Sequence, residues 1–326
     1  MPNWTRFAEI VQSHQRFLLT CHIRPDCDAL GSELAMAAIL ESLGKDVLIV
    51  NGQATPPSYR FLDPQDKLKE LGTDVSIEQL GDREVLIVLD TTAWAQLGPM
   101  GDVIRATRAK KLVLDHHVSG DDLGAEMFKD TTAEATGRLV IEAADALGVE
   151  ITTEIALPAF AALTTDTGWF RFSSATGKTH RLAARLLDTG VKSDELYEQL
   201  YQQDTLARLQ LVGRTMARTK TELDGRLIHT AIELSDFEAT GAHRSDSEDV
   251  INLTLAVEST EAAVIFVEQQ TGGFKISFRS RTDLDCSRLA QLFGGGGHKK
   301  AAGAFLDEPL DSARAKVLDA VRQAMR

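Results

Sequence analysis

The segment FLLTCHIRPDCDALGS, residues 17–32, decides the fold of this chain. Its apolar start predicts a buried strand, and the pattern of residues 30–43 predicts a helix. The polar residues between them therefore lie in a connecting turn. That turn carries His22, Asp26 and Asp28, and one Asp would be enough to cap the helix. The additional Asp and the upstream His indicate a metal site.

The same order of a strand followed by polar residues recurs twice. VLIVL at residues 85–89 precedes Asp90, and KLVL at residues 111–114 precedes Asp115. These strands, together with VLIV at residues 47–50, are apolar throughout and alternate with helical segments, which predicts a parallel sheet covered on both faces. Ligands of such sheets gather at the carboxyl ends of the strands. The fold class is therefore predicted to be α/β, with a doubly wound, mainly parallel sheet.

The Asp and His residues at these strand ends suit two divalent cations. His116 and His117 follow Asp115 directly, so one imidazole can bind metal while the other faces substrate, and the Asp can hydrogen-bond the ligating imidazole. Asp166, within LTTDTGWFRF, is expected at the C-terminal end of a helix. Asp90 lies centrally and is the candidate to bridge two ions. Carboxylates combined with imidazoles favour Mn²⁺ or Mg²⁺ over ions that prefer thiolates.

Composition is that of an ordinary globular protein. The chain has 326 residues, 43% hydrophobic and 25% charged, and no apolar run long enough to span a membrane. A cytoplasmic location is the default expectation. The three cysteines form no C-x-x-C pair, so neither a disulfide framework nor a zinc knuckle is indicated. The net charge of −13 argues against binding to long duplex nucleic acid.

The second half of the chain has a different pattern. We predict a catalytic domain at 1–192, a helical connector at 193–222 and a smaller α/β domain with a mixed sheet at 223–326. Segments 262–269 and 274–280 flank a Gly-Gly turn and predict a hairpin. The Gly-rich loop that follows lets backbone approach a phosphate closely, and two arginines that alternate along a strand would share one face.

Together these motifs resemble the DHH phosphoesterase family, which takes its name from the Asp-His-His triplet. The order HxxPDxDAxGS, Asp after a strand, DHH and TDTGxF matches that family throughout. SFRSR at 277–281 and GGGGHKKAAGA at 294–304 resemble the DHHA1 domain, so the resemblance covers nearly the whole chain. Cys27 departs from the pattern, because a small residue such as Gly or Ala is usual there. Length and domain pairing are similar to the stand-alone oligoribonuclease and pAp-phosphatase branch, the nanoRNase type.

The resemblance implies a role for each matching residue. It implies two divalent cations, Mn²⁺ first and Mg²⁺ or Co²⁺ as alternatives, that share Asp90. His117 would contact the scissile phosphate, with Asp115 behind the ligands. The first ion would be held by His22, Asp26 and Asp90, and the second by Asp28, Asp90, His116 and Asp166. The substrate-binding residues would be Arg279, Ser280, Arg281, Gly295, Gly296, Gly297 and His298. The active site would lie in the cleft between the domains.

The function implied is metal-dependent hydrolysis of short oligoribonucleotides or linear dinucleotides such as pApA and pGpG, and of pAp. A cyclic-dinucleotide phosphodiesterase and an inactive nucleotide sensor are the alternatives. A family II pyrophosphatase would lack the GGGGH element, and a RecJ-type exonuclease would need a longer chain. No G-x-G-x-x-G follows the first strand, so a dinucleotide-binding Rossmann domain is not expected. A membrane partner is not expected, and a homodimer is compatible with the sequence.

Overall fold

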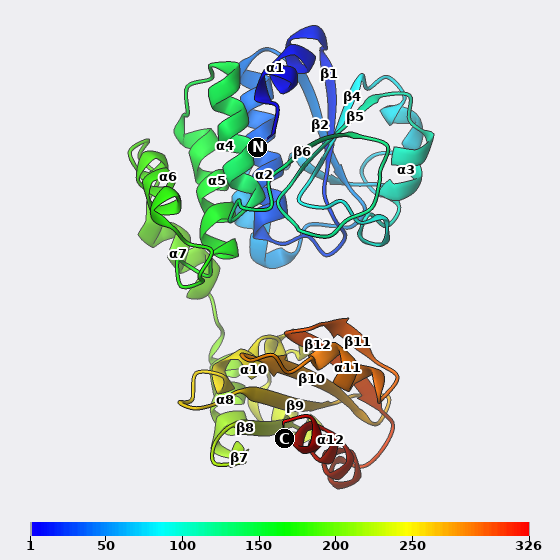
Figure 1. Cartoon of the computed structure of the whole chain (residues 1–326), viewed down its shortest axis with the longest axis vertical. Coiled ribbons are helices and arrows are strands. Elements are labelled where there is room, and N and C mark those ends of the chain that lie inside the picture. The colour runs from blue at the N-terminus through cyan, green and yellow to red at the C-terminus, as the bar shows by residue number, and fades with distance from the viewer. Residues whose placement is uncertain (1, 326) are drawn as a thin grey trace. The chain divides into compact units, whose positions relative to one another are not determined.

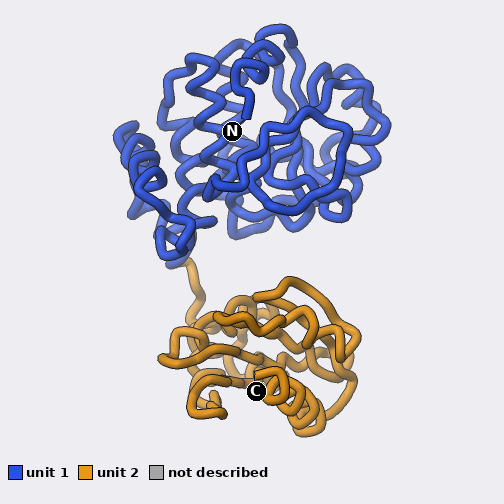
Figure 2. The backbone as a smooth tube through the Cα atoms, viewed as in Figure 1, with its two compact units in different colours: residues 1–202 blue, residues 203–326 orange. Residues whose placement is uncertain are grey.

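The computed structural model describes residues 2–325 and divides them into two compact units (Figure 2). The first unit ends at Gln202 and the second begins at Gln203. This boundary falls within the predicted connector. Helix α7, Ser193–Tyr201, belongs to the first unit, and helix α8, Leu206–Ala217, belongs to the second.

The first unit contains a six-stranded sheet in which every pair of neighbouring strands is parallel. Its order is β3-β2-β1-β4-β5-β6, so the direction of strand succession reverses between β1 and β4. Such a reversal is where open α/β sheets bind ligands. The strands are β1 Arg16–Thr20, β2 Asp46–Asn51, β3 Leu68–Glu70, β4 Val85–Leu89, β5 Lys110–Asp115 and β6 Glu126–Lys129.

Helices cover both faces of this sheet, which confirms the doubly wound prediction (Figure 1). Alternate side chains along one strand belong to different cores: Ile87 packs with the larger cluster of helices, whereas Leu86 and Val88 pack on the side of α3. This is why the central strand β4 is apolar at every position. The helices of this unit besides α7 are α1 Trp4–Ser13, α2 Cys27–Ser42, α3 Met100–Ala106, α4 Thr136–Leu147, α5 Thr153–Asp166 and α6 Gly177–Leu187.

The second unit contains the predicted mixed sheet, with strand order β11-β12-β10-β9-β8-β7. Only β8 and β9 pair in parallel, and β9 and β10 form the predicted hairpin. On β10, Phe274, Ile276 and Phe278 enter the core, which leaves Lys275 and Arg279 on the opposite face. The strands are β7 Lys220–Glu222, β8 Leu227–Ile232, β9 Ala262–Glu268, β10 Phe274–Ser280, β11 Gly296–His298 and β12 Ala301–Leu306. The remaining helices are α9 Leu234–Thr240, α10 Val250–Thr254, α11 Cys286–Gln291 and α12 Leu310–Ala324.

Within residues 2–325, none of the helices has the length and apolar character that a membrane crossing requires.

Candidate active site

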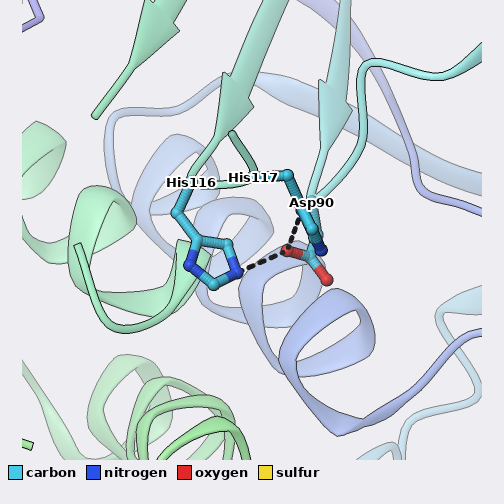
Figure 3. Close-up of side chains that lie close together, drawn as sticks. All are labelled: Asp90, His116 and His117. Atoms are coloured by element: carbon cyan, nitrogen blue, oxygen red, sulfur yellow. Dashed lines mark ion pairs between the residues drawn. The ribbon is translucent and has the colours of Figure 1, made fainter. Parts of the chain in front are cut away.

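Asp90 lies at the end of β4, and its carboxylate faces imidazoles from both neighbouring strands. Its Oδ2 is 3.5 Å from Nε2 of His22, and its Oδ1 is 3.6 Å from Nε2 of His116 and 3.8 Å from Nδ1 of His117. Figure 3 shows the ion pairs on the His116 and His117 side. Thr136 Oγ1 also donates to Oδ1, at 2.8 Å. The two carboxylate oxygens thus serve two different clusters, as a bridging ligand must.

The backbone of Asp90 is left-handed, with φ of +62°. This conformation is uncommon outside glycine, although Asp and Asn tolerate it better than most residues. The Asp90 side chain is 2% exposed, and its backbone N–H donates to the Leu114 carbonyl of the adjacent strand. The carboxylate is therefore fixed in place before any ligand binds.

The first cluster consists of His22, Asp26 and Asp90, with one ligand atom from each lying within 4.8 Å of the others. His22 has its Nδ1 3.0 Å from the Ile23 carbonyl and its Nε2 3.8 Å from Asp26 Oδ2. Asp26 also caps α2 by accepting from the Ala29 N–H, because the helix begins at Cys27, three residues earlier than predicted. Capping one helix and facing a metal position are therefore compatible roles of one carboxylate.

The second cluster consists of Asp28, His116 and Asp166. Nε2 of His116 is 3.7 Å from Asp28 Oδ2 and 3.5 Å from Asp166 Oδ2. These distances exceed those of ordinary N–H···O hydrogen bonds, about 2.7–3.2 Å. Nδ1 of His116 lies 3.1 Å from the Ala133 carbonyl. In the tautomer with the proton on Nδ1, this nitrogen donates to the carbonyl, and Nε2 presents a lone pair to the cluster. Ligating histidines in metal sites are commonly held in this way.

Asp28 is fixed by the beginning of α4. Its two oxygens accept the backbone N–H groups of Thr136 and Gly137, at 2.8 and 3.0 Å, and the Ser32 hydroxyl, at 3.2 Å. A side chain at Gly31 would meet the Pro158 carbonyl at 2.4 Å, so this glycine lets α2 approach α5 closely. Helix α5 in turn ends at Asp166, which brings that carboxylate to the cluster.

The electrostatics of the site favour bound cations. Burial, followed by the charges of Asp90 and Asp166, raises the pKa of Asp28 well above its usual value. Burial also raises the pKa of Asp166 to about 6, with His116 opposing and Asp90 contributing, and raises the pKa of Asp26 with help from Asp90. Four carboxylates that repel one another gain stability when cations neutralise them. Their oxygens and the two imidazoles form a donor set that fits divalent ions of the Mn²⁺ or Mg²⁺ type.

Asp115 is completely buried and supports His117. Its Oδ1 is 2.8 Å from His117 Nδ1 and accepts the His117 backbone N–H at 3.0 Å. Its Oδ2 lies 2.9 Å from both Lys129 Nζ and Thr92 Oγ1. Burial would raise the pKa of Asp115, but His117 and Lys129 hold it well below its usual value. The prediction that Asp115 bonds the metal-facing imidazole is wrong, because that bond goes to His117 and His116 uses the Ala133 carbonyl instead.

The mouth of the site is marked by its most exposed side chains. Asp26, Asp166 and His117 are 57%, 38% and 51% exposed, whereas Asp28 and Asp90 are 2% exposed. The hydrogen bond from Nδ1 to Asp115 leaves Nε2 of His117 as the ring nitrogen available to a ligand. All eight residues predicted from the first half of the chain are therefore brought together. Lys129 was missed, because it lies on the short strand β6, which the sequence analysis did not identify.

In the second unit, the predicted Gly-rich segment forms β11, which pairs with β12. A side chain at Gly295 would meet the Gly303 carbonyl at 2.1 Å, and one at Gly297 would meet Ala302 at 2.6 Å. These two glycines are required by the close approach of the segment to β12, whereas a side chain at Gly296 would meet nothing within 4 Å. His298 is exposed at the end of β11. The open backbone of this segment is therefore centred on Gly296 and His298.

The predicted arginines lie at the end of β10. Arg279 donates to the Phe278 carbonyl at 3.1 Å, and Arg281 lies just beyond the strand with an exposed side chain. Ser280 between them is 7% exposed, and its hydroxyl is 3.1 Å from the Thr282 carbonyl, so it stabilises the turn. Arg281 is therefore the exposed cation of the pair, and Arg279 is half-buried.

Comparison with known proteins identifies both units. Residues 16–163 match the DHH family, N-terminal domain, and residues 224–326 match the DHHA1 domain. A bifunctional oligoribonuclease and PAP phosphatase NrnA of Thermus thermophilus is 34% identical over 94% of this chain and 89% of its own length. The protein of the same name from Bacillus subtilis is 26% identical, with 93% of each chain covered.

A solved structure has the same fold over nearly the whole chain. It is the exopolyphosphatase-related protein of Bacteroides fragilis, with a TM-score of 0.89, 23% identity, and coverage of 98% of this chain and 94% of that one. The sequence motifs, the geometry of the site and the matches to both domains agree. The chain belongs to the DHH family, with a DHH domain followed by a DHHA1 domain.

Proposed function

We propose that this protein is a phosphoesterase that uses two divalent cations, in the first instance Mn²⁺, to hydrolyse short oligoribonucleotides to mononucleotides and pAp to AMP. The observation that carries the proposal is the divided carboxylate of Asp90, whose oxygens face His22 on one side and His116 on the other. The names of the Thermus and Bacillus relatives, oligoribonuclease and PAP phosphatase, support this choice of substrate.

The metal ions, when bound, supply Lewis-acid activation of water and neutralise charge on the phosphate. Asp90 would be a ligand of both ions, and Asp28, whose carboxylate is fixed by backbone N–H groups, would be a ligand of the second. His117, supported by Asp115, presents Nε2 on the exposed side, where it can donate a hydrogen bond to a phosphoryl oxygen or a proton to the leaving oxygen. The hydrogen bond to Asp115 raises the pKa of His117.

We propose that the DHHA1 unit binds the remainder of the substrate through outward-facing groups. Arg279 and Arg281 carry the positive charge, and the open backbone at Gly296 with His298 suits a phosphate. Ser280, with its hydroxyl in a turn, serves to hold the arginines in position. Such a binding surface explains how a chain of net charge −13 acts on RNA, because a short anionic substrate needs only a few cations.

The test is a substrate panel with Mn²⁺, comprising RNA dimers to pentamers, pAp, cyclic di-AMP and pyrophosphate. Substitution Asp90→Asn keeps the shape and tolerates the positive φ but removes the shared charge. We expect the wild type to release mononucleotides and the variant to be inactive with its fold intact. Asp66→Asn is the matched control, because Asp66 has φ of +55° and a side chain that is 87% exposed, outside the site. Turnover by Asp90→Asn would refute the two-metal assignment.

A further inference from the structure

A cavity of about 260 Å³ adjoins the metal clusters and is lined entirely by the first unit. Its lining includes the carboxylates Asp26, Asp28 and Asp166, which are three of the six proposed metal ligands. The other lining residues are Tyr59, Tyr201, Leu200, Cys27 and Thr165. A chemical group bound in this cavity would therefore lie next to a phosphate bound at the metal positions.

The chemistry of the lining excludes a second phosphate. None of the described residues around the cavity is Lys, Arg or His, and its carboxylates face the positions expected for cations. The remaining lining consists of the two tyrosines, Leu200, Cys27 and Thr165, so it carries no charge. Pockets for whole small ligands are typically about 300–1,000 Å³, so a cavity of about 260 Å³ suits one flat ring system rather than a complete nucleotide. A nucleobase has the required shape, and any base can stack on an aromatic side chain.

The tyrosine wall is held in position by the fold. Tyr201 is the last residue of α7, and its ring centroid lies 5.0 Å from that of Tyr197 and 5.7 Å from that of Trp169. It remains 44% exposed, so part of its ring is open to a ligand. Tyr59 lies in the 3-10 helix Pro57–Leu62 and packs against the core of the first unit. An aromatic platform that is already in position loses little entropy when a base stacks on it.

We propose that this cavity binds the nucleobase of the nucleotide whose phosphate lies at the metals, with Tyr201 as the stacking residue. The inference rests on the proposed function and makes it more specific. It gives α7 a role in substrate selection beyond joining the two units. It also predicts that phosphoesters carrying a nucleoside are preferred over pyrophosphate, which has no ring to place there.

The experiment compares wild type, Tyr201→Ala and Tyr201→Phe on pApA and on two versions of that dinucleotide, each lacking one of its two bases. We expect Tyr201→Ala to raise KM for pApA about tenfold, equivalent to about 1.4 kcal/mol. Tyr201→Phe retains the ring and should resemble the wild type. The dinucleotide that lacks the base bound in the cavity should already have a raised KM with the wild type, and Tyr201→Ala should raise it no further.

The outcomes separate this inference from the proposed function. If the wild type releases no mononucleotide from pApA, the proposed function fails before any variant is compared. If the wild type is active but Tyr201→Ala has an unchanged KM for pApA, the base-binding inference is wrong. It is also wrong if Tyr201→Ala raises KM for both base-deficient dinucleotides as much as for pApA, because that result would show a general disturbance of the site. Mn²⁺ titration and thermal unfolding of each variant verify that the metal clusters and the fold are intact.

Discussion

Substitution Asp115→Asn separates support of His117 from metal binding. The oxygens of Asp115 contact His117, Lys129 and Thr92. Asp115 belongs neither to the two clusters described above nor to the third group of potential metal ligands in the described part of the chain, Asp90, His116 and His117. The substitution leaves the Lys129 ammonium without its anionic partner, and breaking a buried pair in this way costs about 3–5 kcal/mol. Lys129 is 18% exposed, so water compensates in part and about 3 kcal/mol is the appropriate figure.

The cost predicts a clear shift in thermal unfolding. For domains of this size, 1 kcal/mol corresponds to about 2–4 °C in Tm, so we expect a decrease of about 6–12 °C. The His117 imidazole also loses the anion that orients it, and turnover should fall about 10²- to 10⁴-fold, the range of general acid–base catalysis. Mn²⁺ affinity, measured by titration, should remain close to that of the wild type.

A double variant tests the explanation. Asp115→Asn combined with Lys129→Met removes the unpaired ammonium while keeping a side chain of similar length, so Tm should recover and turnover should not. The reasoning is refuted if the double variant stays as unstable as the single one, or if Asp115→Asn retains turnover within a few-fold of the wild type. Loss of Mn²⁺ binding in the single variant would place Asp115 among the residues that determine the metal clusters.

Three further predictions follow from the charges of each unit. Mn²⁺ at 100 times its Kd should raise the free energy of unfolding of the first unit by about 2.7 kcal/mol for each bound ion, relative to protein in EDTA. Asp90→Asn should lose this gain, as thermal scans with and without metal would reveal. In the second unit, burial would raise the pKa of Asp236, but the Glu233 N–H and the guanidinium groups of Arg218 and Arg214 lower it. A carboxyl group whose pKa is lower in the folded state stabilises the fold at pH values above its pKa in the unfolded chain, which is about 4. This contribution to stability is lost as pH falls through the pKa of the folded state. Asp236→Asn should therefore cost about 2 kcal/mol at pH 7, since the arginines are partly exposed, and urea unfolding should show that difference shrinking below pH 4. Finally, Arg279→Gln should raise KM for RNA oligomers with little change in kcat, and an equal loss in kcat would argue against a purely binding role.

The central strands of the first sheet could be predicted from sequence because both of their faces are buried. VLIVL is apolar at every position and corresponds to β4 over its full length. Strands β3 and β6, with sequences LKE and EMFK, lie at the two edges of the sheet, where one side lacks a partner strand and polar residues are tolerated. They carry no run of apolar residues, so the pattern that identified β4 could not identify them.

The same difference explains which site residues could be predicted. His22, Asp26 and Asp166 lie in short segments whose residue types are unusual for turns and helix ends, so the local sequence is informative. Lys129 is an isolated cation on a strand that the sequence did not reveal. Its role depends on Asp115, 14 positions earlier, and only the pairing of β5 with β6 brings Nζ to 2.9 Å from Oδ2 of that residue. Tyr201 ends a helix of ordinary sequence, and nothing in that sequence places its ring beside a metal ligand. Contacts made by tertiary packing leave no local pattern.

The two oxygens of the Asp90 carboxylate face different imidazoles because of the order of the strands rather than because of the residue types. His22 follows β1, His116 follows β5, and β4 lies between these strands in the sheet. A carboxylate at the end of the middle strand has an imidazole on each side, and the left-handed backbone of Asp90 fixes it there. If β4 were at an edge of the sheet, the same residues would supply at most one complete cluster. The pair of clusters on either side of Asp90 is therefore a consequence of the point where the strand order reverses, which also explains why the clustered residues come from segments spread over more than 140 residues of the chain.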